Sequence, residues 1–94
     1  MAQSKGPIFQ PNYAVCPGLL LKQEVNHHQL TQAEFARRIA RTEQQVNDIV
    51  NGKTPIDLET AIQFERVLGI GADIWLGMES HYRLDQARLQ LPKK

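Results

Sequence analysis

Polar side chains between Glu43 and Asp48 have the types and spacing of a surface that recognises a partner through hydrogen bonds. At helical periodicity, Glu43, Gln44, Asn47 and Asp48 fall on the polar side of one helix. An amide donates and accepts together, so Gln44 and Asn47 can each pair bidentately with adenine. A carboxylate repels phosphate but can accept a hydrogen bond from the N4 amino group of cytosine. These four are therefore candidate base-contacting residues, the alternative being an ordinary solvated helix face.

Two short helices joined by a tight turn must position this polar face. The first begins with a capping box, in which Thr31 accepts from the backbone N–H of Glu34 and Glu34 accepts from that of Thr31. Thr42 is the N-cap candidate of the second helix. Because only about three or four residues join the helices, they must cross closely, and Ala36 is the small residue that such a crossing needs. This pattern predicts a helix-turn-helix, in which the first helix braces a second one that enters the major groove.

Residues that start and stop helices predict three more of them along the chain. Pro17 stands at the first position of one helix, Asp57 caps another that Gly69 closes, and the last begins near Ala72. No pattern typical of strands occurs. We therefore predict an all-α fold, with a compact five-helix domain over residues 17–94 and an extended N-terminal arm over residues 1–16.

Seven residues around the two central helices are candidates for contacts with phosphate. Basic side chains beside a recognition helix can anchor the DNA backbone, which positions a protein without reading sequence. A helix N-terminus can also donate backbone N–H groups to a phosphate. The candidates are Thr31, Gln32, Arg38, Arg41, Thr42, Asn51 and Lys53. The alternative for the arginines is ordinary surface charge, paired with Glu34 or Glu43.

The last predicted helix carries an apolar face of its own. Its members are Ile74, Trp75, Met78 and Tyr82. So apolar a helix near the end of a small domain is a candidate interface for a two-fold homodimer. Trp75 is also a candidate for the core.

Composition places the chain among small globular proteins. Its 94 residues suffice for one domain, and 41% hydrophobic with 22% charged residues excludes a disordered chain. The net charge of +1 gives no overall basic field, but a local basic patch on a neutral domain can still bind nucleic acid. The single cysteine, Cys16, cannot form an intramolecular disulfide, and no signal peptide or membrane span is evident. A reduced, cytoplasmic location is the expectation.

Other residues that could do chemistry form no constellation. The adjacent His27 and His28 lack a third metal ligand nearby, and nothing in the pattern orients Cys16 as a nucleophile. The carboxylates outside the polar face fall on separate helical faces and suggest no acid–base pair. We therefore expect no enzymatic activity, no catalytic residue, no metal and no cofactor.

Over residues 15–87 the sequence resembles the helix-turn-helix domain of HigA/VapI-type antitoxins, within the phage-repressor-like (Xre/Cro) class. The motifs that carry the resemblance are Pro17-Gly18 followed by leucines, Leu30-Thr31-Gln32, Glu34-Phe35-Ala36, Val46-Asn47-Asp48-Ile49-Val50-Asn51-Gly52-Lys53, Ile56, Glu59-Thr60-Ala61, Val67-Leu68-Gly69, and Trp75-Leu76 followed by Glu79 and Tyr82. The resemblance implies a phage-repressor-like fold and a homodimer that binds a palindromic double-stranded operator at its own promoter. It also implies binding to a small mRNA-cleaving toxin.

Two features of the sequence keep other functions open. Tyr13-Ala14-Val15 and Glu65-Arg66-Val67-Leu68-Gly69 resemble helix-turn-helix domains fused to ImmA/IrrE-type zinc peptidases, although no His-Glu-x-x-His motif is present. A stand-alone phage-type or peptidase-associated regulator without a toxin is therefore an alternative. The acidic Glu43 and Asp48 favour another, a protein-interaction module that has lost DNA binding.

One position departs from the pattern of the family. Ala40 stands where the turn between the two central helices usually has glycine. Alanine there either adopts a positive φ, at a cost of about 1 kcal/mol, or forces a different turn.

Overall fold

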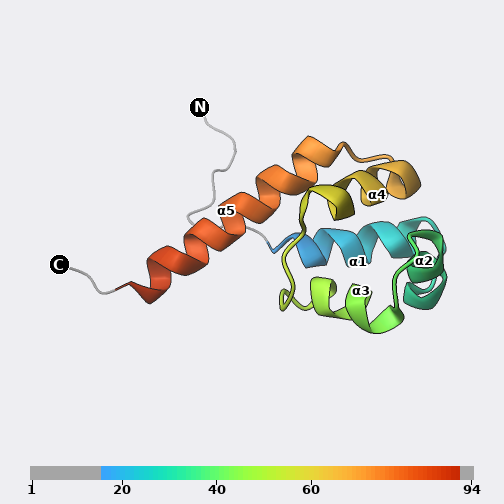
Figure 1. Ribbon diagram of the computed structural model, residues 1–94, viewed down its shortest axis with the longest axis horizontal. Coiled ribbons are helices and arrows are strands. Elements are labelled where there is room, and N and C mark those ends of the chain that lie inside the picture. The colour runs from blue at the N-terminus through green and yellow to red at the C-terminus, as the bar shows by residue number, and fades with distance from the viewer. Residues whose placement is uncertain (1–15, 92–94) are drawn as a thin grey trace, which may run out of the picture.

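Five α-helices joined by short turns make up the part of the chain that the computed structural model describes, residues 16–91 (Figure 1). They are α1 (Pro17–His27), α2 (Gln32–Arg38), α3 (Glu43–Val50), α4 (Leu58–Leu68) and α5 (Ala72–Gln90). Residues 16–91 contain no strand. This confirms the predicted all-α class and the predicted order of helices. Apart from Cys16, the proposed N-terminal arm lies outside the described residues.

The ends of the helices lie where the predicted caps put them. Thr31 and Glu34 form the capping box at the start of α2, with N–O distances of 2.8 and 3.0 Å. Asp57 accepts from the backbone N–H of Thr60 at 2.9 Å at the start of α4, and Gly69 ends that helix with a left-handed φ of 84°. These caps are local hydrogen bonds between neighbours in sequence, so the sequence alone specifies them.

An aromatic cluster lies at the centre of the core and joins three helices. Phe64 on α4 contacts both Phe35 on α2 and Trp75 on α5, with ring centroids 5.5 and 5.1 Å apart. All three rings are fully buried. Trp75 therefore belongs to the core and leaves no side-chain surface for a partner, so it is not part of the apolar interface proposed from the sequence.

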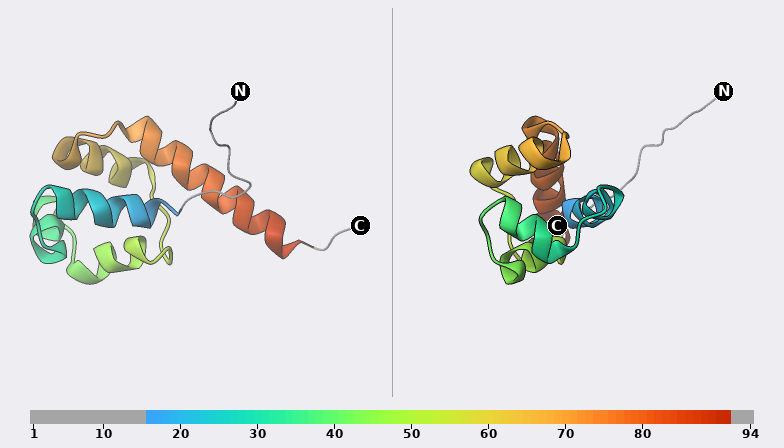
Figure 2. Two further views of the ribbon diagram at one scale, coloured as in Figure 1. Left: turned by 180° about the vertical axis from the view of Figure 1, so that it is seen from behind. Right: turned by 90° about the vertical axis from the view of Figure 1, so that its right-hand side faces the viewer.

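The helices are arranged so that α3 lies at one edge of the molecule. α1 packs between α3 on one side and the α4–α5 pair on the other, and α2 packs against α3 (Figures 1 and 2). The first part of α5 packs on α4 and α1, whereas its C-terminal part projects past the other helices (Figures 1 and 2). Both α3 and the end of α5 are thus accessible elements.

Ala40 adopts a φ of 58° in the turn between α2 and α3. Of the two outcomes that the sequence left open, the structure shows the left-handed backbone, which is unfavourable for a residue with a Cβ. We expect Ala40→Gly to raise the free energy of unfolding by about 0.5–1 kcal/mol, measured by urea denaturation.

The control for this prediction is Ala87→Gly, the same substitution at an exposed position inside α5. It is expected to lower the free energy of unfolding by about 1 kcal/mol, because glycine is a poor helix former. A loss of stability in both variants would contradict the strain at Ala40.

Candidate nucleic-acid interface

Helix α3 turns a polar face outward because its apolar face is fixed in the core. Val46 and Ile49 are buried against the other helices. Of the predicted base-contacting residues, the structure leaves Glu43 and Gln44 exposed and Asn47 and Asp48 half-buried. All four lie on α3, which is at the edge of the molecule, so a partner can reach this face (Figure 1).

A second capping box fixes the start of α3. The hydroxyl of Thr42 accepts from the backbone N–H of Gln45 at 3.1 Å, and the Gln45 side chain accepts from the backbone N–H of Thr42 at 2.8 Å. Sequence reasoning found Thr42 but missed Gln45. The signal was present, because threonine followed three residues later by glutamine is a capping-box pattern.

Gln44 and Asp48 pair with each other on the outer face of α3. The side-chain amide of Gln44 donates from Nε2 to Oδ1 of Asp48 at 2.8 Å. An amide nitrogen carries two hydrogens, so one N–H and the oxygen of Gln44 remain for another partner. The pairing is therefore compatible with bidentate recognition of adenine.

The C-terminal end of α3 closes in a Schellman motif that places Lys53 at the surface. Gly52 has a left-handed φ of 77°, its N–H donates to the carbonyl of Ile49 at 3.1 Å, and that of Lys53 donates to Asp48 at 2.8 Å. Lys53 and the preceding Asn51 are exposed. Both directly follow the polar face of α3, at the end of the helix.

Arg41 has a structural role that the sequence did not reveal. Its guanidinium donates to Oε1 of Gln63 at 2.9 Å and to Oγ1 of Thr60 at 2.8 Å, both on α4. Gln63 in turn donates to the carbonyl of Ile39 at 3.0 Å. These bonds attach the α2–α3 turn to α4. We therefore leave Arg41 out of the proposed phosphate contacts.

The other predicted phosphate contacts remain accessible to different degrees. The side chains of Thr31 and Thr42 accept from backbone N–H groups as N-caps, which leaves each hydroxyl hydrogen able to donate. Arg38 is exposed at the end of α2, and Gln32 is half-buried at its start. None of these positions is distant from α3, because α2 packs against it.

Of the residues proposed for a dimer interface, three offer surface on α5. Ile74 is 52% exposed, and Met78 and Tyr82 are half-buried. Farther along the same helix, Leu84 and Leu89 are exposed as well. Exposed apolar side chains therefore continue along α5 past Tyr82, toward its C-terminal end.

Three groups in the described residues titrate away from their ordinary range. The pKa of Glu34 is lowered by the backbone N–H of Thr31, and that of Asp57 by hydrogen bonds from Thr60, chiefly its hydroxyl. The pKa of the Tyr82 phenol is raised, first by its electrostatic interaction with the neighbouring Cys16 and then by partial burial. The first two shifts reflect helix capping rather than a catalytic site.

Neither a metal centre nor a membrane-spanning helix is found within residues 16–91. No group of three or more His, Cys, Asp and Glu residues in that range is arranged to hold a metal ion. None of the five helices is long and apolar enough to cross a membrane.

Comparison with known proteins gives one family match and several structural matches. The helix-turn-helix family model matches residues 21–75. No curated protein sequence matches significantly.

Three solved structures illustrate the structural similarity. The Pseudomonas aeruginosa antitoxin HigA, solved with the higBA promoter, is 28% identical, with 81% of this chain and 84% of that chain covered and a TM-score of 0.75. A P. aeruginosa protein in complex with its 18-base-pair operator DNA is 26% identical, with 84% and 86% covered and a TM-score of 0.74. An addiction module antidote protein of a HigA family from Coxiella burnetii shares the fold at 20% identity, with 87% and 99% covered and a TM-score of 0.73.

Proposed function

The chain belongs to the helix-turn-helix family, and on that premise we propose that it is a sequence-specific DNA-binding transcriptional regulator. The observation that carries the proposal is the outer face of α3, which presents amide side chains at the edge of the molecule while α2 braces its inner face. In helix-turn-helix proteins this second helix enters the major groove. The two P. aeruginosa relatives that were solved with promoter or operator DNA support the same role.

In the proposed complex, α3 reads base edges and its surroundings hold the backbone. Gln44 and Asn47 pair with adenines, while Glu43 and Asp48 accept from cytosine amino groups. The phosphate contacts are Thr31, Gln32, Arg38, Thr42, Asn51 and Lys53. Because Lys53 follows the Schellman turn directly, it is positioned to reach the backbone beside the groove that α3 occupies.

The finer proposal is that the chain is the antitoxin of a HigBA-type module. As a homodimer joined through α5, it would place two α3 helices about 34 Å apart on a palindromic operator and repress its own promoter. It would also neutralise a small mRNA-cleaving toxin through a surface other than α3. The similarity to antitoxin HigA and to the antidote protein of C. burnetii supports this reading.

Replacing Gln44 tests base recognition directly. We expect Gln44→Ala to lower the discrimination at one operator position by about 1–3 kcal/mol and to leave the other positions unchanged. Fluorescence anisotropy would measure it, with DNA from upstream of the gene and a panel of single-base variants, against scrambled DNA over a salt series. If that DNA is not preferred, selection from random duplexes would supply the operator.

Lys53→Ala is the matched control, because it removes a phosphate contact instead of a base contact. It should weaken binding to every duplex equally and flatten the dependence of log K on log salt by about one unit. If both variants bind like the parent, α3 does not enter the groove in the proposed orientation.

A protein-interaction module is the second candidate function. It is favoured by the acidic Glu43 and Asp48 on the face of α3, since carboxylates repel the DNA backbone. This candidate predicts no preference of the parent for any selected duplex, together with binding to a protein partner in the absence of DNA.

A further inference from the structure

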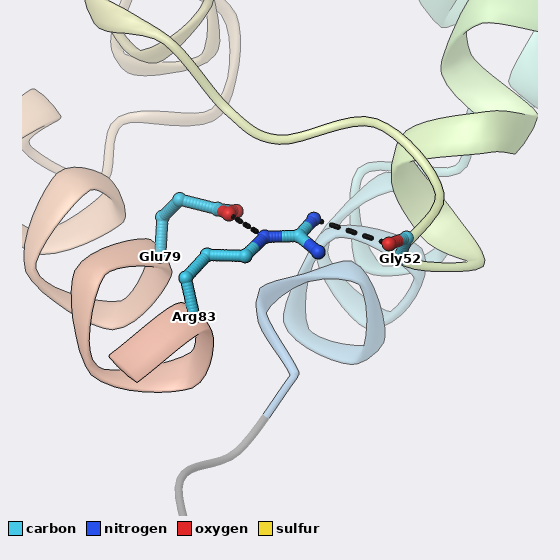
Figure 3. Close-up of polar contacts among 3 residues, drawn as sticks. All are labelled: Gly52, Glu79 and Arg83. Carbon is cyan, nitrogen blue, oxygen red and sulfur yellow. Dashed lines mark hydrogen bonds and ion pairs between the residues drawn. The ribbon is translucent and has the colours of Figure 1, made fainter. Parts of the chain in front are cut away.

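Arg83 links the middle of α5 to the turn that follows α3. One terminal nitrogen of its guanidinium donates to the backbone carbonyl of Gly52 at 3.1 Å, across 31 positions of sequence (Figure 3). Its Nε donates to Oε2 of Glu79, one helical turn earlier on α5 (Figure 3). One side chain thus joins α5 to the turn that follows α3.

The surroundings of this link indicate a stable contact rather than a transient one at the surface. We call the contact of Arg83 with Glu79 and Gly52 the joint. Glu79 is 7% exposed, whereas the side chain of Arg83 is 38% exposed, so the carboxylate is buried and the guanidinium covers it from the surface. A Cβ added to Gly52 would lie 3.3 Å from the hydroxyl of Tyr82 and 3.5 Å from the sulfur of Cys16. Side chains from α5 and from the residue before α1 therefore pack on the same turn that Arg83 binds.

The joint also has an electrostatic reason to sit at this end of α3. The C-terminal end of a helix carries partial negative charge on its free carbonyls, and a nearby guanidinium stabilises it. Within the Schellman motif the carbonyls of Asp48 and Ile49 already accept backbone hydrogen bonds. Gly52 lies three residues past Ile49, just beyond the end of α3, and its carbonyl accepts from Arg83.

From this geometry we infer that Arg83 is a positioning residue, which fixes the angle and distance between α3 and α5. The inference rests on the proposed function, in which α5 joins two copies and α3 reads DNA. If the two copies pair through α5, the Arg83–Gly52 contact fixes the position of each α3 relative to the dimer interface. Arg83 would then set the half-site spacing that the dimer accepts without contacting DNA itself.

The test must remove the contact without leaving Glu79 buried and unpaired, because a lone buried carboxylate would destabilise the fold. The double variant Glu79→Leu with Arg83→Met replaces the pair by apolar side chains of similar size, an exchange that folded proteins often tolerate. Arg83→Lys keeps the charge but loses the planar fork that serves both partners. Arg88→Met, at an exposed arginine of α5, is the control for removing an arginine from this helix.

The first measurement is binding to inverted repeats of the selected half-site with one base pair added to or removed from the centre. The parent and Arg88→Met are expected to prefer one spacing by about tenfold or more, and the double variant and Arg83→Lys to lose most of that preference. The salt dependence should stay at the parental value in Arg83→Lys, since Arg83 is not a phosphate contact. A general loss of stability would weaken binding to every spacing alike.

The second measurement needs no DNA. Hydrogen exchange of the Gly52 and Lys53 amides, which bind α3 carbonyls in the parent, should accelerate about tenfold or more in the double variant while the amides of α4 keep their rates. Unchanged exchange at these amides would show that Arg83 does not hold the turn after α3 in place. If the parent binds DNA specifically and the folded double variant keeps the same spacing preference, the spacing role alone is overturned. A parent with no DNA preference would overturn both the proposed function and the spacing role.

Discussion

Trp75→Ala is expected to lower the free energy of unfolding by about 3–5 kcal/mol. A domain of this size has roughly 5–15 kcal/mol in total, so the substitution should remove a large share of the stability of the fold. The reason is the position of the indole, which is fully buried and packs edge-on against Phe64 with centroids 5.1 Å apart. Its removal would leave a cavity bounded by α4 and α5, which pack against each other.

Circular dichroism under urea is the appropriate measurement, because Trp75 is the only tryptophan of the chain and its loss abolishes the usual fluorescence signal. Leu58→Ala removes an exposed apolar side chain from α4 and should change the unfolding free energy by no more than about 0.5 kcal/mol. A similar, small effect of both substitutions would contradict the placement of Trp75 at the centre of the core.

Trp75→Phe separates ring packing from hydrogen bonding at the same position. The Nε1–H of Trp75 is buried without a hydrogen-bond partner among the described residues. An unpaired buried donor is itself unfavourable by about 1–3 kcal/mol, so phenylalanine should recover most of the stability lost in Trp75→Ala.

Local signals in the sequence were sufficient for the helices themselves. Thr31, Thr42, Asp57 and Gly69 each act within a few residues of their own position, so the sequence shows both the residue and its hydrogen-bond partner. The apolar spacing of α3 likewise predicted which face turns inward. For these reasons the all-α class, the helix order and the capping residues could be predicted from the order of residues alone.

Contacts between helices could not be predicted in the same way. Arg41 meets Gln63 across 22 positions and Arg83 meets Gly52 across 31, and nothing in the sequence pairs these residues. Apolar character predicted that Trp75 is buried, but not whether its own chain or a second copy buries it. Such choices depend on how helices pack, which side-chain spacing alone does not determine.

Gly18→Ala is the other substitution for which we expect a large effect, because α1 and α3 approach each other too closely for a Cβ at this position. A Cβ on Gly18 would lie 2.1 Å from the carbonyl oxygen of Val50 and 2.7 Å from that of Ile49. These are backbone atoms at the end of α3, so no side chain can rotate away to make room. The expected loss is about 3 kcal/mol, at the upper end for overpacking.

The same change at Gly77 provides a control of opposite sign. Gly77 lies inside α5 with open space where a Cβ would go, so Gly77→Ala should raise the free energy of unfolding by about 0.5–1 kcal/mol through helix propensity. Urea denaturation of both variants compares the two positions under identical chemistry. Because Gly18 packs on the end of α3, its variant should also bind every operator duplex more weakly, even at temperatures where it is fully folded. A Gly18→Ala chain as stable as Gly77→Ala would show that α1 and α3 are not in backbone contact, and the position of the recognition helix would have to be revised.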